Sequence, residues 1–190
     1  IFYAKFSKRN LDMNSLENID WTSISTIVMD FDGVFTDNSV YVQEDGIEFV
    51  KCSRSDGLGI NLLKRYSKAI NWRLDLFILS TETNPVVTSR AKKMGIECYQ
   101  AITDKKSFIK DYVVRTRGGN PCRKILYVGN DLNDYEAMLE CDLIFCPQDS
   151  HALIRQIAHH VIPTNGGHGV IREMVETILP KSPDRLLSFL

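Results

Sequence analysis

Two aspartates in the segment VMDFDGVFTD could work as one chemical site. Asp30 and Asp32 directly follow the apolar run that ends at Met29. Residues two apart in an extended segment point to the same side, so both carboxylates can face one cavity. Asp and Gly are also common where a strand ends in a turn, and that structural interpretation explains this segment alone equally well.

Polar side chains follow other apolar segments as well. Ser80 follows LDLFIL, Lys105 begins the helix predicted after ECYQ, and Asn130, Asp131 and Asp134 follow KILYV. In an open α/β sheet, ligands bind outside the carboxyl ends of the strands, so these side chains are expected at one rim. Each has an alternative: Ser80 could end a strand, and the two aspartates could begin a helix.

Lys105 is the residue that a purely structural role explains least well. A cation in the first turn of a helix opposes the macrodipole, at a cost of roughly 0.3 to 1 kcal/mol, although Asp104 offsets part of it. A bound anion such as a phosphoryl group explains the lysine better. The acids around it need a cation, and a hard oxygen-preferring ion with few protein ligands favours Mg²⁺. The joint prediction is phosphoryl transfer, with a carboxylate attacking a phosphate neutralised by metal and lysine.

Strand-like and helix-like segments alternate from about Ser25 onward, which predicts an α/β fold: a three-layer Rossmann-like parallel sheet flanked by helices. We expect strands at STIVM, LDLFIL, ECYQ, KILYV and DLIF. We expect helices over about 56–69, 85–94 and 105–115, and another after KILYV. The predicted domains are a tail or linker over 1–22, the α/β domain over 23–180 and a C-terminal tail over 181–190.

One segment interrupts the alternation between the first strand and its helix. SVYVQEDGIEFVKC has apolar residues at alternate positions around Asp45-Gly46, which is the pattern of a β-hairpin. A hairpin at this place could form a flap over the site, and no separate cap domain is expected.

Composition excludes several partners. The 190 residues include 23 basic and 24 acidic side chains, so neither nucleic acid nor a membrane surface is an expected partner. No apolar run reaches the roughly 18 residues of a membrane span, and we expect a cytoplasmic protein. The five cysteines are scattered and odd in number, which favours reduced, packed thiols.

The order D-x-D, Ser/Thr, Lys and G-[DN]-D-x-x-D resembles the haloacid dehalogenase-like phosphohydrolases. DFDGVFTD, RSDGLGI, YVGNDLND and GGHGVIRE are similar to the capless branch that contains 3-deoxy-manno-octulosonate 8-phosphate phosphatase. They also resemble the phosphatase-like C-terminal domain of acylneuraminate cytidylyltransferases, toward which STETNP and GND lean. The resemblance covers about residues 27 to 179.

The resemblance implies a role for each site residue. Asp30 would be the nucleophile, forming an aspartyl-phosphate, and Asp32 the general acid and base. Ser80 and Lys105 would hold phosphoryl oxygens. The implied Mg²⁺ ligands are the Asp30 carboxylate, the Asp32 main-chain carbonyl and Asn130, supported by Asp131 and Asp134. Implied substrate contacts come from Gly33, Thr81, Asp56, His168 and Arg172, although the last two also fit a turn followed by an amphipathic helix.

Two positions depart from the family pattern. The active phosphatases usually have Asp at the position of Asn130, whose amide can bind Mg²⁺ but adds no charge. The octulosonate phosphatases carry Gly-Arg at the positions of Thr81 and Glu82. An acidic side chain there disfavours the anionic end of that substrate, so a nine-carbon, sialic-acid-type sugar phosphate is favoured over the octulosonate type.

The resemblance also implies a homotetramer, in which the hairpin packs against neighbours and a neighbour's C-terminal tail can close each site. The resemblance to the cytidylyltransferases implies that residues 1–22 are the end of a linker from a fused or lost cytidylyltransferase domain, which agrees with a sequence that begins with Ile. An alternative function is therefore a weakly active or inactive oligomerisation module of such an enzyme. A glycosyltransferase that uses D-x-D leaves the lysine and the GND segment unexplained.

Overall fold

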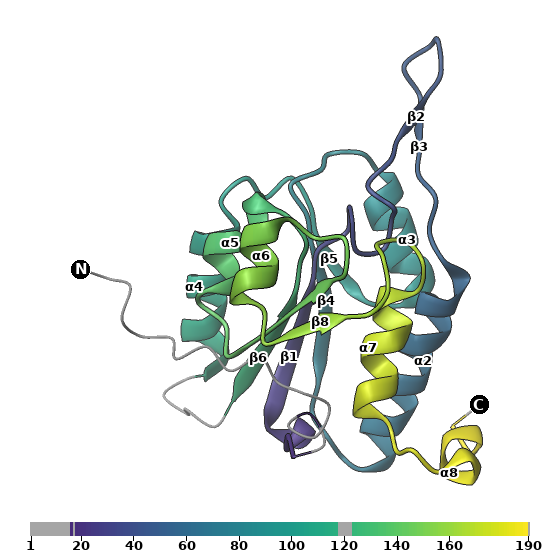
Figure 1. Cartoon of the computed structure of the whole chain (residues 1–190), viewed down its shortest axis with the longest axis vertical. Helices are drawn as coiled ribbons and strands as arrows, with labels where there is room; N and C mark the ends of the chain where they lie inside the picture. Colours follow the sequence, from purple (N-terminus) through teal and green to yellow (C-terminus); the bar gives the residue numbers. More distant parts are fainter. Residues whose placement is uncertain (1–15, 17, 118–122, 190) are drawn as a thin grey trace.

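A parallel β-sheet forms the middle layer of the molecule (Figure 1). The computed structural model describes residues 16, 18–117 and 123–189, so most of the predicted tail and Cys122 lie outside the described residues. Within them the sheet has the strand order β5-β4-β1-β6-β7-β8, and every neighbouring pair is parallel. The strands are β1 (Ile24–Met29), β4 (Asp75–Leu79), β5 (Glu97–Tyr99), β6 (Lys124–Val128), β7 (Leu143–Pro147) and β8 (His160–Ile162).

Helices cover both faces of this sheet (Figure 1). On one face lie α2 (Arg54–Ala69), α3 (Val86–Met94) and α7 (Val170–Ile178). On the other lie α4 (Lys105–Arg117), α5 (Leu132–Met138) and α6 (Ala152–Ile157). The predicted three-layer α/β fold is therefore confirmed.

Side-chain alternation along β1 separates two hydrophobic cores. Ile27 and Met29 pack into the core beneath α2, α3 and α7, whereas Val28 packs into the core beneath α4, α5 and α6. Such near-continuous apolar runs are typical of parallel strands that are buried on both faces.

The order of the strands places a crevice at the end of β1. The chain first builds β4 and β5 on one side of β1 and then β6, β7 and β8 on the other. This reversal is a topological switch point, where open α/β sheets bind their ligands. The carboxyl ends of β1, β4 and β6 meet there.

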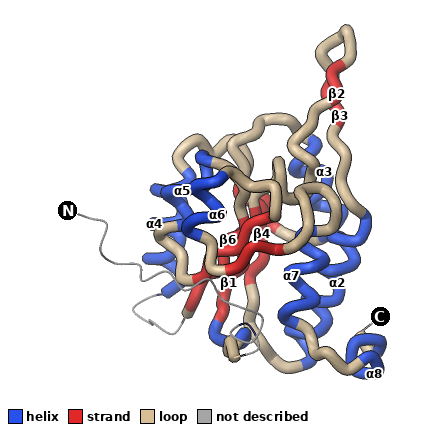
Figure 2. Tube along the Cα trace, viewed as in Figure 1, coloured by secondary structure: helices blue, strands red, loops and turns tan. Residues whose placement is uncertain are grey.

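The predicted β-hairpin is present and projects away from the body of the molecule (Figure 2). It pairs β2 (Tyr41–Val42) with β3 (Glu48–Phe49), and Gly46 has a φ of 82° in its turn. Between β1 and α2 the described chain contains this hairpin and no separate cap domain. Its apolar residues Val40, Tyr41, Val42, Ile47 and Phe49 are all exposed.

The ends of the chain pack more closely than the predicted boundaries suggest. Leu16 is buried in the core. Trp21 of the 3-10 helix η1 (Trp21–Ser23) packs edge-on against Phe145, with 6.3 Å between the ring centroids. After residue 180, helix α8 (Pro183–Leu187) is followed by Phe189, which packs against Tyr66 at 5.4 Å. Within the described residues a core residue, Leu16, thus precedes the predicted boundary at 22, because apolar residues in a weakly patterned segment still fill the edge of the core.

Local sequence explains where the helices begin and end. Ser53 caps α2, which starts two residues earlier than predicted. The side chain of Asn84 accepts a hydrogen bond from Val86 N, and Gly95 ends α3 with a φ of 64°. In the part of the chain that the structure describes, no helix is long and apolar enough to cross a membrane.

Candidate active site

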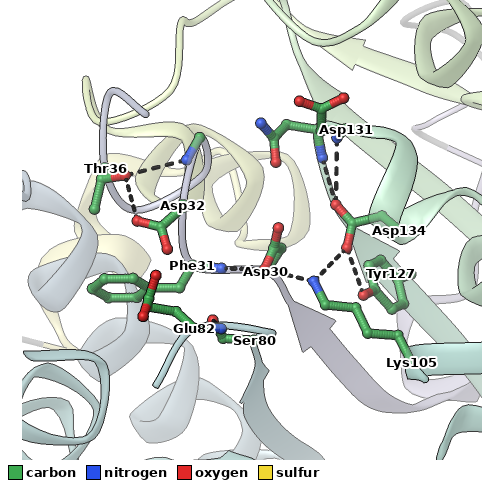
Figure 3. Close-up of polar contacts among 12 residues, drawn as sticks. Asp30, Phe31, Asp32, Thr36, Ser80, Glu82, Lys105, Tyr127, Asp131 and Asp134 are labelled. Atoms are coloured by element: carbon green, nitrogen blue, oxygen red, sulfur yellow. Dashed lines mark hydrogen bonds and ion pairs between the residues drawn. The ribbon is translucent and has the colours of Figure 1, made fainter. Parts of the chain in front are cut away.

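The two aspartates lie where β1 ends, and the backbone of Asp30 is hydrogen-bonded to β6. Asp30 N donates to Val128 O at 2.9 Å, which continues the pairing with β6. The buried Asp30 carboxylate accepts a hydrogen bond from Phe31 N at 2.8 Å through Oδ1. Asp32 accepts one from Thr36 Oγ1 at 3.1 Å (Figure 3). Both carboxylates line one cavity, as predicted from their spacing.

Lys105 connects two of the predicted acids. Its Nζ lies 2.8 Å from Asp30 Oδ1 and 2.8 Å from Asp134 Oδ1, and its side chain is 1% exposed (Figure 3). These contacts explain why a lysine stands in the first turn of α4. The cost of opposing the helix dipole is small beside the attraction of two buried carboxylates.

Asp134 is itself fixed by several donors. Its Oδ1 accepts from Tyr127 Oη at 2.9 Å, and its Oδ2 accepts from Asn130 N at 3.0 Å. It also completes a capping box with Asp131 at the start of α5. A Cβ at Gly129 would lie 2.6 Å from Asp134 Oδ2, so only glycine leaves room for this carboxylate.

The buried charges do not balance among themselves, because one ammonium serves two carboxylates. Burial and the charge of Asp134 raise the pKa of Asp30 to about 8, although Lys105 opposes this shift. Burial acts to lower the pKa of Lys105, but the two carboxylates outweigh it and the pKa is raised. The cluster therefore carries excess negative charge when ionised, which a further cation would neutralise.

Asp32 lies in a different environment. Burial is the main cause that raises its pKa, the hydrogen bond from Thr36 opposes the rise, and the charge of Glu82 adds to it. A raised pKa favours the protonated form, which is the form that a general acid needs.

The cavity at this rim has a volume of about 310 Å³. Ser80 is buried beside it, and its Oγ accepts a hydrogen bond from Glu82 N at 3.0 Å. The lining residues are Asp30, Asp32, Asn38, Ser80, Thr81, Asn130, Asp131, Leu132 and Asn133. Predicted residues from β1, β4 and the β6–α5 turn thus meet in one place.

Asn130 supplies the observation that tests the site for a metal. Its Oδ1 is buried and has no hydrogen-bond partner among the described residues. An unpartnered buried acceptor is costly, and a bound cation would satisfy it. In the described part of the chain, no three His, Cys, Asp or Glu side chains form a metal cluster by themselves. A set made of one carboxylate, one main-chain carbonyl and one amide oxygen fits Mg²⁺, which keeps several waters.

Gly33 makes room for this amide. It has a φ of 77°, and a Cβ there would lie 1.9 Å from Asn130 Nδ2. Its N–H donates to Thr36 Oγ1 at 3.2 Å. Its predicted contact with a phosphate remains a prediction.

Besides Gly33, three predicted substrate contacts do not line the cavity. Asp56 is buried between α2 and α7, where its Oδ1 accepts from Arg172 N at 3.0 Å. His168 is exposed and its Nδ1 is bonded to Gly166 O, while Arg172 pairs with Glu176. The interpretation of GGHGVIRE as a turn followed by an amphipathic helix describes this segment better.

Other residues of the site were missed from the sequence. Tyr127 and Thr36 hold Asp134 and Asp32, whereas Asn38, Leu132 and Asn133 line the cavity. Thr36 stands four residues after Asp32 in the same turn, and this short spacing was the available signal. Nothing local marks Tyr127, because an inward-facing Tyr on a buried strand resembles any core aromatic.

Comparison with known proteins places this site in a class. No family model matches the chain. The 3-deoxy-D-manno-octulosonate 8-phosphate phosphatase KdsC of Yersinia pestis is 30% identical over 158 residues, which cover 83% of this chain and 80% of that protein. A solved structure from Streptomyces avermitilis, assigned to the HAD hydrolase family, has a TM-score of 0.73 and 38% identity and covers 82% of this chain and 84% of that one.

A further solved structure holds ligands. It is the 3-deoxy-D-manno-octulosonate 8-phosphate phosphatase from Moraxella catarrhalis with a magnesium ion, a phosphate ion and KDO. It has a TM-score of 0.74 and 26% identity and covers 88% of this chain and 92% of that chain. Fold, site and likeness together define an enzyme of the phosphoric monoester hydrolase class.

The chain belongs to the haloacid dehalogenase-like superfamily, in the capless branch of the 3-deoxy-D-manno-octulosonate 8-phosphate phosphatases. The predicted family is thereby confirmed at this level. The predicted link to acylneuraminate cytidylyltransferases stays a prediction, which these relatives do not support.

Proposed function

We propose that the chain is a Mg²⁺-dependent phosphatase that hydrolyses phosphates of keto-deoxy sugar acids through an aspartyl-phosphate. The observation that carries this proposal is the buried Asp30–Lys105–Asp134 cluster beside the unpartnered Oδ1 of Asn130. It combines a carboxylate nucleophile, a fixed ammonium and an amide acceptor that lacks a partner. Of these groups, Asp30 and Asn130 both line the cavity.

Asp30 is the proposed nucleophile. Its Oδ1 accepts hydrogen bonds from Phe31 N and Lys105, so attack falls to Oδ2. Oδ2 forms a bond to phosphorus as the bond to the ester oxygen breaks, and Asp32 gives its proton to that leaving oxygen. Asp32 then takes a proton from water, whose oxygen attacks phosphorus and releases inorganic phosphate from Asp30.

Ser80 and Lys105 hold the phosphoryl group during both steps. The Ser80 hydroxyl lies at the cavity wall, and the ammonium of Lys105 is fixed by two carboxylates before any substrate arrives. Donors fixed in advance lower the barrier, because they need not reorient as charge develops.

Asp30, the main-chain carbonyl of Asp32 and Asn130 would hold the metal ion. When bound, Mg²⁺ neutralises phosphate charge and keeps the Asp30 carboxylate ionised. Mg²⁺ stands in the Moraxella catarrhalis structure, which supports the same choice here.

The substrate class rests on the relatives and on Glu82. The Yersinia pestis relative is named for an octulosonate 8-phosphate. Here the Glu82 carboxylate accepts hydrogen bonds from Thr83 N and Asn84 N, which fixes its charge near Asp32. We therefore favour a nine-carbon, sialic-acid-type phosphate over the octulosonate. The longer carbon chain of the nine-carbon substrate would place the substrate's own carboxylate further from the Glu82 carboxylate.

The exposed hairpin supports a homotetramer. Five large apolar side chains stand on a two-stranded ribbon that has no other layer to cover it in the described chain. An isolated hairpin is marginally stable at best in water, so packing against another copy would stabilise it. Sedimentation of the full chain tests this, with a tetramer expected and a monomer against it.

Phosphate release from a panel of eight- and nine-carbon keto-sugar acid phosphates tests the proposed activity. Release should require Mg²⁺, favour the nine-carbon esters and disappear in Asp30→Asn. Release no greater than that of Asp30→Asn on every ester would contradict it and favour the oligomerisation module.

A further inference from the structure

Asp56 is a buried carboxylate that the proposed reaction does not use. It lies in the first turn of α2, and its Oδ1 accepts a hydrogen bond from Arg172 N at 3.0 Å. The backbone N–H of Ile171 also favours the ionised form of this carboxylate. Both N–H groups belong to the first turn of α7, a helix distant in sequence.

These contacts replace a missing helix cap. Helix α7 begins after Gly169, which has a φ of 101° and offers no side chain to cap the helix. Ile171 and Arg172 are its second and third residues, whose N–H groups an N-cap side chain normally satisfies. Asp56 therefore caps α7 from α2, and no described residue donates to its other oxygen, Oδ2.

The two helices approach closely at this cap. α2 and α7 lie side by side (Figure 1). A Cβ at Gly59 would lie 3.0 Å from Arg172 Cα, so a larger residue would push the helices apart. The first turns of both helices surround Asp56, and the positive ends of their dipoles stabilise a buried negative charge.

The segment before α7 rests directly on the catalytic loop, which we define as residues 30–37. Gly167 N donates to Val34 O at 3.1 Å. A Cβ at Gly166 would lie 2.3 Å from Gly33 O, and one at Gly167 would lie 2.5 Å from Asp37 N. The two backbones touch without a side chain between them, so a shift of one displaces the other.

Within the catalytic loop, Thr36 connects this supported backbone to the Asp32 side chain. Thr36 Oγ1 accepts hydrogen bonds from Gly33 N and Asn38 N at 3.2 Å each, and it donates to Asp32 Oδ1 at 3.1 Å. Thr36 therefore orients the proposed general acid from within the segment that Gly166 and Gly167 support.

We infer that Asp56 is a positioning residue for phosphate-ester hydrolysis: by capping α7 from α2, it presses residues 166–169 onto the catalytic loop and so fixes Asp32. The inference rests on the proposed function only in the role that it gives to Asp32. The inference gives a role to the RSDGLGI and GGHGVIRE segments, which lie outside the cavity. We call the contact of Asp56 with α7, together with residues 166–169 on the catalytic loop, the brace.

Hydrogen exchange of the full chain tests the brace without any need for activity. The variants are Asp56→Ala, Asp56→Asn and, as a matched control, Glu176→Ala, which removes the ion pair of the Arg172 side chain and keeps the cap. In Asp56→Ala, amides of residues 165–172 and of the catalytic loop should exchange about 10-fold faster. Asp56→Asn, which can still accept one hydrogen bond, should show a smaller change in the same two segments, and Glu176→Ala should show none.

Leaving groups separate positioning of Asp32 from a general loss of structure. The p-nitrophenolate of p-nitrophenyl phosphate leaves with little need of a general acid, whereas the sugar oxygen of a sugar phosphate must be protonated as it leaves. Asp56→Ala should lower kcat at least about 10-fold more for a sugar phosphate than for p-nitrophenyl phosphate, with partial recovery in Asp56→Asn.

The remaining outcomes also decide whether Asp56 positions the catalytic loop. If Asp56→Ala does not fold, Asp56→Asn alone is compared with the native chain. Faster exchange confined to residues 165–172, or spread evenly over all peptides in Asp56→Asn, would overturn the inference, as would equal kcat losses on both esters. If the native chain hydrolyses no ester, the proposed function fails, and the exchange result still decides whether Asp56 braces the loop.

Discussion

The two sides of Asp30 are built differently. On one side of Asp30 lie Lys105, Asp134 and Tyr127, all buried and joined by hydrogen bonds (Figure 3). On the other side lie Asp32 and Glu82, which are partly exposed. The hairpin reaches this side, where Glu48 Oε2 accepts a hydrogen bond from Asn84 Nδ2 at 3.1 Å. The first side comes from strand ends and helix starts, and the second from turns and loops.

We attribute phosphoryl transfer to the buried side and the choice of sugar to the exposed side. A phosphoryl group presents the same charge and shape in every ester, so a rigid, buried cluster can bind it. The sugar varies, and loops can change around it without disturbing the core. We therefore expect substitutions on the buried side to abolish activity and those on the exposed side to change which ester is preferred.

Asp30→Asn removes the proposed nucleophile from the buried side and should abolish phosphate release. Without the nucleophile, kcat for phosphate release should fall by roughly 10⁴-fold or more. The matched control is Asp111→Asn, since Asp111 is exposed on α4 and does not line the cavity. A comparable loss in both variants would contradict the assignment.

Lys105→Met should destabilise the fold as well as stop the reaction. It leaves Asp30 and Asp134 buried together without their ammonium, at an expected cost of about 3–5 kcal/mol in urea denaturation. Lys106→Met is the control on the same turn, because its pair with Glu136 is exposed and surface ion pairs contribute little to stability. Equal losses would show that the cluster does not stabilise the fold.

Asp56→Asn should remove a pH dependence of stability. Burial raises the pKa of Asp56 from 3.8 to about 6 in the folded state. The folded state therefore binds this proton more tightly, so the stabilisation is complete below pH 4 and is lost as the pH rises through 6. Its size is on the order of 3 kcal/mol. Parallel curves of unfolding free energy against pH for Asp56→Asn and the native chain would contradict this prediction.

Asn130→Asp should strengthen metal binding. A carboxylate adds the charge that the amide lacks, and Mg²⁺ affinity should rise about 10- to 100-fold in calorimetry. Asn133→Asp, at the cavity wall but outside the proposed ligand set, is the control. An unchanged affinity in Asn130→Asp would remove Asn130 from the ligands.

Glu82→Gln, on the exposed side, should have the smallest effect. Removing its charge should lower KM for an octulosonate 8-phosphate by a few-fold, about 1 kcal/mol or less, and leave kcat nearly unchanged. Glu44→Gln at the hairpin tip serves as control. A large loss of kcat in Glu82→Gln would place Glu82 in the chemistry.

The sequence predicted the fold well because its signals are local. Buried parallel strands read as apolar runs, and helix ends carry caps such as Ser53 and Gly95. The rule that strand ends gather at one rim then brought Asp30, Ser80 and Asn130 together correctly.

Contacts between distant residues escaped prediction for a physical reason. Lys105 and Asp30 are 75 residues apart, and no local pattern shows that one lysine bridges two aspartates. Asp56, His168 and Arg172 were placed near the substrate by motif resemblance, which gives residue types but not the direction in which a side chain points. The contact of Asp56 with Arg172 N depends on how α2 packs against α7. His168 and Arg172 instead bond to groups two and four residues away, Gly166 O and the Glu176 side chain.

Rapid-quench mass spectrometry of the enzyme during turnover tests the central claim most directly. With Mg²⁺ and a hydrolysed sugar phosphate, the peptide that contains residues 28–37 should carry one acid-stable, base-labile phosphoryl group on Asp30. The same peptide from Asp30→Asn should carry none. A phosphoryl group on another residue, or turnover with none at any quench time, would contradict an aspartyl-phosphate formed within the buried cluster.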